Sequence, residues 1–70
     1  MDDARIRVNG KSETLACATV AELLAGKGVE AQGRGVAVAV NGQVVPRGLW
    51  SDTRLTPGDA VEIVRAMKGG

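Results

Sequence analysis

The chain has 70 residues, and 44% of them are hydrophobic, but it contains one Trp and no Phe or Tyr. A chain of this length makes one domain with a small aliphatic core, because it buries only about 60% of the surface that its unfolded form exposes. Nine basic residues against eight acidic ones, scattered and without aromatic partners, exclude the charged stacking surfaces of nucleic-acid binders.

The N-terminal stretch and the residue types exclude further classes. "MDDARIRV" has two acidic residues and no apolar run, so it is typical of neither a signal peptide nor a membrane segment, and we expect a cytoplasmic protein. One Cys and no His leave no pair for a disulfide and no ligand cluster for a structural metal. We therefore expect no bound cofactor.

The first predicted element is a β-hairpin. In "RIRVNGKSETLA", apolar and polar residues alternate on both sides of Asn9-Gly10, a dipeptide typical of two-residue hairpin turns. A short helix follows in "TVAELLAGKG", where Thr19 can cap the N-terminus and Glu22 stands where a capping box needs its carboxylate. Gly26 and Gly28 are candidate helix stops. The apolar helix residues fall on one face: Val20, Leu23 and Leu24.

Three more strands complete the pattern. "VAVAV" reads as a strand with its valines on the core side and its alanines on the other. Asn41-Gly42 predicts a turn, followed by a strand that is short or at an edge, which Pro46 ends because it cannot donate to a ladder. "TPGD" is a turn with Pro57 at its second position, and "AVEIVRAM" is the last strand.

This order of elements predicts an α+β fold of the ubiquitin-like β-grasp kind, a mixed sheet of four or five strands wrapped on one helix. We expect residues 1–66 to form the single domain and residues 67–70 to form a flexible C-terminal tail. In "VPRGLW", we expect Trp50 to fold back over one end of the core and Arg47 to be exposed, where it can contact a partner.

The chain has few means of catalysis of its own. His is absent, and no nucleophile is paired with a base by its spacing. Cys17 lies just before the predicted helix, where a thiolate could be activated, but a lone Cys in this position is more often a small, partly buried apolar residue. We favour the structural interpretation and a protein that is not an enzyme.

The tail is the candidate reactive part. Four extended residues, Met67, Lys68, Gly69 and Gly70, reach about 14 Å, which is long enough to enter a partner's active site. Glycine lets a backbone pass through a channel too narrow for a Cβ atom, and the α-carboxylate of Gly70 is an unhindered acyl group. The pattern favours a division of labour in which the domain is recognised and the tail reacts.

The segment "AVAVNGQVVPRGLWSDTRLTPGDAVEIVRAMKGG", residues 37–70, resembles the C-terminal half of the ThiS sulfur carriers of thiamin biosynthesis, and "TVAELL" is similar to the family's helix start. The resemblance implies a carrier on which a ThiF-like adenylyltransferase, using ATP and Mg, converts the Gly70 carboxylate to an acyl-adenylate. Sulfur from a cysteine desulfurase persulfide then gives a thiocarboxylate, and a ThiG-like thiazole synthase takes up that sulfur. Lys68 departs from the family pattern by placing a charge beside the diglycine.

Two alternatives stay open at this point. The small subunit of molybdopterin synthase shares the implied fold and the terminal diglycine, and a ubiquitin-like interaction module could carry an incidental Gly-Gly end.

For docking, we expect Val61 and Ile63 to face the core and Val64 to face outwards. If the first and last strands are neighbours, Val64 would lie beside Arg5 and Arg7. There it is either the centre of a small interface or one of the singly exposed aliphatic residues that are normal on any surface.

Overall fold

The elements follow one another in the predicted order, with one addition. The structure is a computed structural model that describes residues 4–29 and 35–65. The described residues form five strands, one α-helix and one 3-10 helix: β1 (Arg5–Val8), β2 (Lys11–Thr14), α1 (Val20–Gly26), β3 (Val36–Val40), β4 (Gln43–Val45), the 3-10 helix η1 (Arg47–Asp52) and β5 (Ala60–Arg65). The addition is η1.

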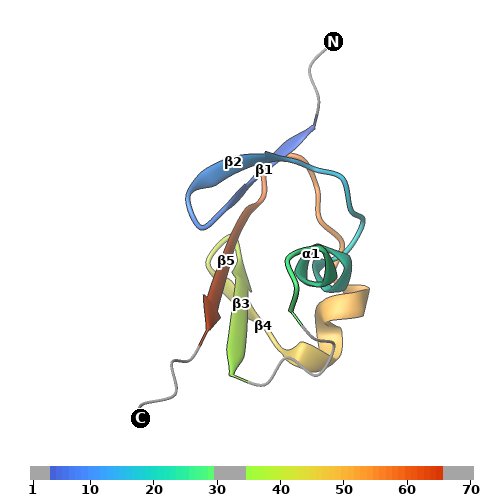
Figure 1. Ribbon diagram of the computed structural model, residues 1–70, viewed down its shortest axis with the longest axis vertical. Helices are drawn as coiled ribbons and strands as arrows, with labels where there is room; N and C mark the ends of the chain where they lie inside the picture. Colours follow the sequence, from blue (N-terminus) through green and yellow to red (C-terminus); the bar gives the residue numbers. More distant parts are fainter. Residues whose placement is uncertain (1–3, 30–34, 66–70) are drawn as a thin grey trace.

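The strands form one mixed sheet in the order β2-β1-β5-β3-β4. β5, the last strand, lies in the centre, parallel to β1 on one side and antiparallel to β3 on the other. β1 pairs with β2 and β3 pairs with β4 as antiparallel hairpins. The helix α1 lies against one face of this sheet, and η1 lies next to it (Figure 1). The predicted mixed sheet on one helix is confirmed.

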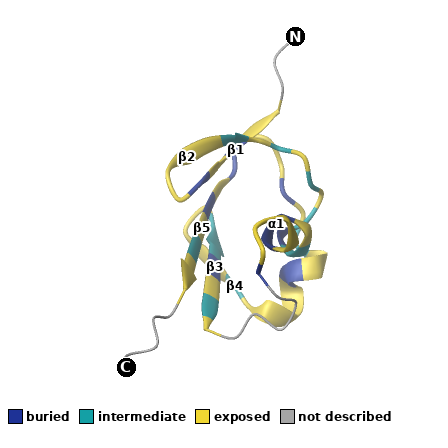
Figure 2. Cartoon of the chain, in the orientation of Figure 1, coloured by how far each residue is buried: buried dark blue, intermediate teal, exposed yellow. Residues whose placement is uncertain are grey.

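The core lies between α1 and the inner face of the sheet, where the buried positions gather (Figure 2). Strand alternation places the apolar side chains there, since successive side chains of a strand point to opposite faces. In β3 the valines face inwards and Ala37 and Ala39 face outwards, as predicted. The buried hydrophobic residues are Ile6, Val8, Val20, Leu23, Leu24, Val29, Val38, Trp50, Leu55 and Val61.

The helix α1 begins and ends at the signals in the sequence. The hydroxyl of Thr19 accepts a hydrogen bond from the backbone N–H of Glu22 at 3.2 Å, and Glu22 Oε1 accepts one from the N–H of Ala18 at 2.8 Å. The capping box is therefore present, but Glu22 bonds the N–H before the cap residue rather than that of the cap itself. Gly28, with a φ of +82°, follows the helix in the conformation that favours glycine.

The 3-10 helix η1 had no counterpart in the sequence prediction, because a helix of six residues is too short to show an apolar repeat. Pro46 precedes it with a φ of −59°, which suits a helix entry. Trp50 lies in η1 with 4% of its surface exposed, and so it covers part of the core as predicted. Arg47, at the start of η1, is exposed, as also predicted.

Both Asn-Gly hairpin turns are bound to β5. Asn9 and Asn41 have φ values of +51° and +53°, the left-handed conformation that a two-residue hairpin turn requires. The side-chain oxygen of Asn41 accepts from the N–H of Ala60 at 2.9 Å, at the beginning of β5. The side-chain oxygen of Asn9 accepts from the N–H of Ile63 at 2.8 Å, near its end. The two turns therefore hold opposite ends of the central strand.

Candidate functional site

The candidate site begins where β5 ends. The predicted reactive residues, Met67, Lys68, Gly69 and Gly70, lie outside the described residues, and so does the predicted tail. β5 ends at Arg65, which is also the last residue that the structure describes. The described part of the candidate site is therefore β5 and the surfaces beside it.

The two faces of β5 are as predicted. Val61 is buried and Ile63 packs against the core, while Glu62 and Val64 are exposed on the outer face. Val64 exposes 62% of its surface. The outer position of this valine is the structural basis for treating it as a docking residue.

Val64 belongs to a strip of apolar residues on the outer face of the sheet. In the register of β5 and β3, Val64 lies opposite Ala37, and in that of β3 and β4, Ala39 lies opposite Val44. Val44 exposes 73% of its surface. We call these four residues, Ala37, Ala39, Val44 and Val64, the outer apolar strip. Each alanine therefore lies beside one exposed valine, and Glu62, which lies opposite Ala39 on β5, borders the strip.

The arginines predicted to surround Val64 lie elsewhere. β1 and β5 are neighbours, but their register pairs Arg7 with Ala60, four residues before Val64, or roughly 13 Å along the strand. Arg5 is further away in the same direction and donates from Nε to the hydroxyl of Ser12 at 2.8 Å. The expectation that Val64 lies beside Arg5 and Arg7 was therefore wrong. The reason is that β1 ends at Val8 and turns away before it reaches the level of Val64.

Arg47 lies on the other side of the sheet. Together with Trp50 and Ser51 of η1 it lines a pocket of about 260 Å³, whose remaining lining comes from α1 and Val29. The structure therefore does not bring Arg47 together with the outer apolar strip, since α1 packs on the inner face. The four predicted docking residues belong to three separate regions: Val64 alone, Arg5 with Arg7, and Arg47.

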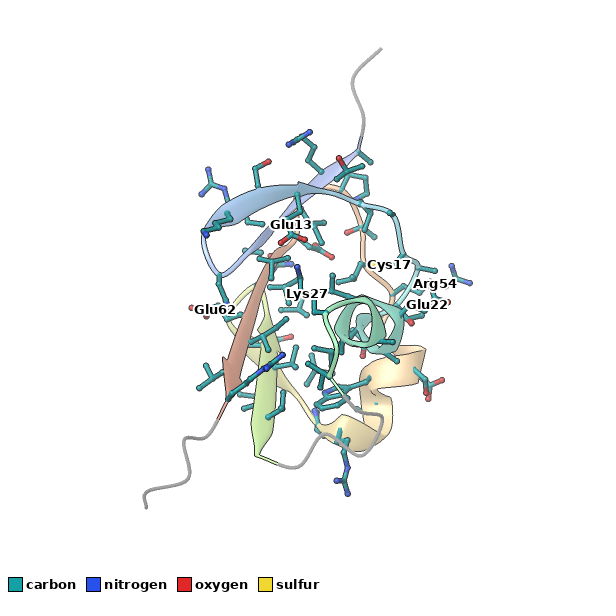
Figure 3. The ribbon with its side chains drawn as sticks, in the orientation of Figure 1. Glu13, Cys17, Glu22, Lys27, Arg54 and Glu62 are labelled. Carbon is teal, nitrogen blue, oxygen red and sulfur yellow. The ribbon has the colours of Figure 1, made fainter. Side chains whose placement is uncertain are left out.

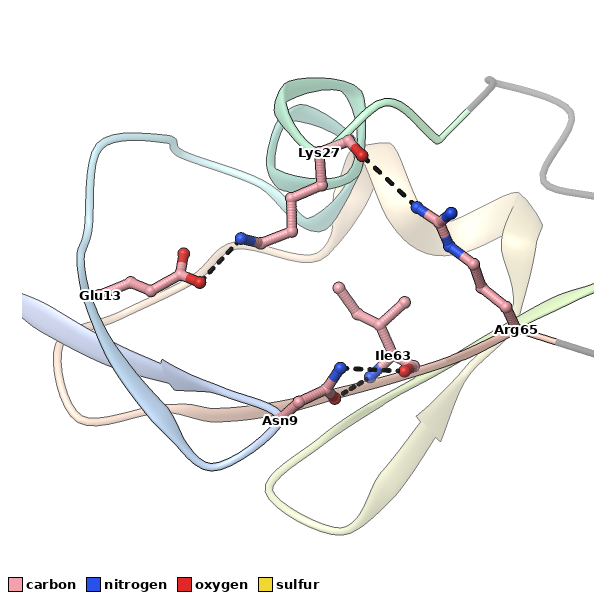
Figure 4. Close-up of polar contacts among 5 residues, drawn as sticks. All are labelled: Asn9, Glu13, Lys27, Ile63 and Arg65. Atoms are coloured by element: carbon pink, nitrogen blue, oxygen red, sulfur yellow. Dashed lines mark hydrogen bonds and ion pairs between the residues drawn. The ribbon is translucent and has the colours of Figure 1, made fainter.

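Polar contacts connect the end of β5 with the neighbouring elements (Figure 4). Asn9 exchanges two hydrogen bonds with the backbone of Ile63, donating from Nδ2 to its carbonyl at 3.2 Å and accepting from its N–H. Arg65 Nη2 donates to the carbonyl of Lys27 at 3.4 Å, just beyond the C-terminus of α1. Lys27 Nζ in turn pairs with Glu13 Oε2 at 2.7 Å. Sequence patterns did not reveal these contacts, because they depend on the register of distant strands.

Cys17 has the environment of a structural residue. It is half-buried and packs against the core, with Glu22 nearby on α1 (Figure 3). Burial, and after it the negative charge of Glu22, raise the pKa of the Cys17 thiol above its ordinary value, so the reactive thiolate is disfavoured at neutral pH. This direction of the pKa shift favours the structural interpretation of Cys17 over an activated thiol.

The described part of the chain shows neither a cluster of metal ligands nor a membrane-spanning helix. Residues 4–29 and 35–65 contain no group of three or more His, Cys, Asp or Glu side chains that could hold a metal ion. Over the same residues, no helix is both long and apolar enough to cross a membrane. The described domain thus presents a central strand, an outer apolar strip and a pocket lined by Arg47 as its notable features.

A mixed sheet with its last strand in the centre, parallel to the first, and a single α-helix on one face define a ubiquitin-like β-grasp domain. The comparison with family models agrees, since the model of the ThiS family matches residues 6–70. The chain belongs to the ThiS family, whose members are small sulfur-carrier proteins of thiamin biosynthesis.

Solved structures agree with this assignment. The chain is 40% identical to the crystal structure of the thiamine biosynthesis protein ThiS from Geobacter metallireducens, with a TM-score of 0.75, over 94% of this chain and 99% of that one. An NMR solution structure of a thiamine biosynthesis protein from the same organism is 39% identical, with a TM-score of 0.75, over 94% and 87% of the two chains. The search of the curated proteins found no match.

Proposed function

We propose that this protein carries sulfur for thiazole formation in thiamin biosynthesis, and that the sulfur is held as a thiocarboxylate on Gly70. The observation that carries the proposal is the match to the ThiS family over residues 6–70, which includes the terminal Gly-Gly. The match to the ThiS family favours this role over that of a molybdopterin synthase small subunit or of a ubiquitin-like interaction module.

The proposed chemistry takes place at the C-terminal carboxylate. A ThiF-like adenylyltransferase with ATP and Mg joins the Gly70 carboxylate to AMP and releases pyrophosphate, because a free carboxylate is a poor electrophile. A persulfide, formed with sulfur from a cysteine desulfurase, attacks the acyl carbon, and AMP leaves. A thiol then reduces the resulting acyl disulfide, which releases the thiocarboxylate and forms a disulfide between the two other sulfur atoms. A ThiG-like thiazole synthase accepts the sulfur.

In this scheme the carrier supplies no catalytic group. The raised pKa of Cys17 and its packing against the core agree with a structural role for that residue. The carrier's contribution is binding energy: ordering four tail residues costs on the order of 4 to 8 kcal/mol, which docking of the folded domain has to offset. ATP, Mg and the sulfur donor belong to the partners.

We assign the docking of the adenylyltransferase to the outer apolar strip. Val64 of the strip is one residue from the last described residue, Arg65, so a partner seated on the strip is close to the segment that it must take up. An exposed apolar centre with polar surroundings is the usual composition of such an interface. Arg47, on the other side of the sheet, is then left for a different contact.

The test is the exchange of radiolabelled pyrophosphate into ATP by the purified adenylyltransferase. Exchange should require the carrier and should be absent with a chain that lacks Gly70, because deletion moves the carboxylate one residue back. A circular dichroism spectrum identical to that of the full chain would show that the deletion leaves the fold intact. Equal exchange with and without Gly70 would contradict the proposal.

A further inference from the structure

The edge of β5 that faces β1 changes its hydrogen-bond partner near its end. The ladder between the two strands pairs Arg7 with Ala60 and Val8 with Val61. The backbone N–H of Asn9 still donates to the carbonyl of Val61 at 2.9 Å. After that residue the chain turns through Gly10 into β2, so the backbone of β1 no longer reaches β5.

The side chain of Asn9 takes the place of the missing strand backbone. Its amide donates to the carbonyl of Ile63 and accepts from the N–H of Ile63, so one side chain makes the two bonds that two successive partners on a parallel neighbouring strand would otherwise form. Along a strand, alternate residues direct their backbone groups to opposite neighbours, so β3 cannot satisfy these groups of Ile63. Asn9 therefore continues the ladder by one step towards the end of β5 (Figure 4).

We infer that Asn9 is a positioning residue, whose side chain fixes the end of β5 and thereby the point from which residues 66–70 are presented to the activating partner. The inference rests on the proposed function. Ile63 is two residues before the end of β5, and the left-handed turn holds the Asn9 amide at the correct level. Because transfer depends on accurate placement of the carboxylate, loss of this contact should slow the reaction rather than weaken docking.

The chain contains a matched control in its second Asn-Gly turn. Asn41 has nearly the same φ as Asn9, and its side chain also binds β5, but at Ala60, five residues before the strand ends. Replacement of either residue by glycine keeps the left-handed turn free of strain and removes only the side chain. Asn9→Gly removes two bonds to the backbone of Ile63. Asn41→Gly removes one bond to the N–H of Ala60 and one to the carboxylate of Asp59, so each variant loses two bonds, at opposite ends of one strand.

The experiment measures the carrier-dependent pyrophosphate exchange of the adenylyltransferase, the dissociation constant of the complex, and the hydrogen exchange of the Ile63 amide by NMR. For Asn9→Gly we expect a maximal exchange rate at least about fivefold lower, since small misplacements cost large factors in rate, with a dissociation constant within about twofold of that of the wild type. Protection of the Ile63 amide should fall by about fivefold or more. Asn41→Gly should retain the wild-type rate and the Ile63 protection.

Each other outcome decides the inference or the function. An unchanged rate in Asn9→Gly, or an equal loss of rate in Asn41→Gly, would overturn the role of Asn9 while leaving the proposed function intact. Wild-type carrier that supports no exchange would overturn the proposed function instead. In that case the hydrogen exchange of Ile63 alone would decide whether Asn9 holds the strand, and wild-type protection in Asn9→Gly would contradict it.

Discussion

The indole N–H of Trp50 donates to the carbonyl of Val45 at 2.9 Å, which joins the 3-10 helix η1 to the edge strand β4. The ring itself is buried against the core, with 4% of its surface exposed. The single aromatic residue of the chain therefore fills part of a small aliphatic core and also satisfies a backbone carbonyl at the end of a strand. In a domain this small, such a residue contributes a large share of the stability.

Replacement of Trp50 should separate these two contributions. Trp50→Ala should lower the free energy of unfolding by about 3 to 5 kcal/mol, whereas Trp50→Phe, which keeps most of the ring and loses the N–H, should cost less. Arg47→Ala, at an exposed neighbouring position, should stay within about 0.5 kcal/mol of the wild type. Urea denaturation followed by circular dichroism measures all three. A larger loss for Arg47→Ala than for Trp50→Ala would reverse the two roles.

Asp59 should give the domain a characteristic response to acid. Burial raises the pKa of this carboxyl, but hydrogen bonds from the backbone N–H of Thr56, the amide of Asn41 and the hydroxyl of Thr56 outweigh it, and the pKa lies below its ordinary value. The unfolded chain, with a pKa of about 3.9, therefore takes up the proton first. The contribution of Asp59 to stability is present above that pH and is lost as the pH falls through the folded pKa.

Asp59→Asn is the variant that tests this. At pH 7 it should lower the free energy of unfolding by about 1.5 to 3 kcal/mol, because it removes a charged acceptor from three donors. Below about pH 4 the difference between variant and wild type should shrink, as the wild type loses the same bonds. Denaturation curves across this pH range provide the measurement. A difference that stays constant on acidification would mean that the Asp59 charge contributes nothing.

Val64→Asp tests the docking surface. A carboxylate in the outer apolar strip should weaken binding to the adenylyltransferase by about 1 to 2 kcal/mol, or roughly five- to thirtyfold in dissociation constant. Because Val64 is exposed, the fold should remain intact. Ser51→Asp is the control, since Ser51 is exposed on η1, on the helix side of the sheet. Titration calorimetry that gives both variants the wild-type dissociation constant would place the docking surface elsewhere.

The sequence predicted those features that depend on local rules. The hairpin turn at Asn9-Gly10, the cap at Thr19 and the edge strand before Pro46 were all recognised because each has a short-range signal. The position of Val64 relative to Arg7 was wrong, because it depends on the register of two strands that are more than 50 residues apart in the chain. No local pattern encodes such a register.

The same reason explains the contacts that the sequence did not reveal. Asn9 was recognised as a turn residue, but its bonds to Ile63 require β5 to lie next to β1 at one particular offset. The 3-10 helix around Trp50 has no apolar periodicity, so it was not predicted. The burial of Trp50 was predicted from the size of its ring and not from a pattern. The glycines and the free carboxylate of Gly70 marked the tail as the candidate reactive part, but the adenylation and thiocarboxylate steps were inferred only from the resemblance to a family.

The most direct test of the proposed function locates the transferred sulfur. After reaction with ATP, Mg, the adenylyltransferase and a sulfur donor, the protein is digested and its peptides are analysed by tandem mass spectrometry. We predict that the C-terminal peptide carries sulfur in place of one oxygen at Gly70, and that Cys17→Ser gives the same product. Sulfur added at Cys17 as a persulfide, with an unmodified C-terminal peptide and no product in folded Cys17→Ser, would contradict the proposed function.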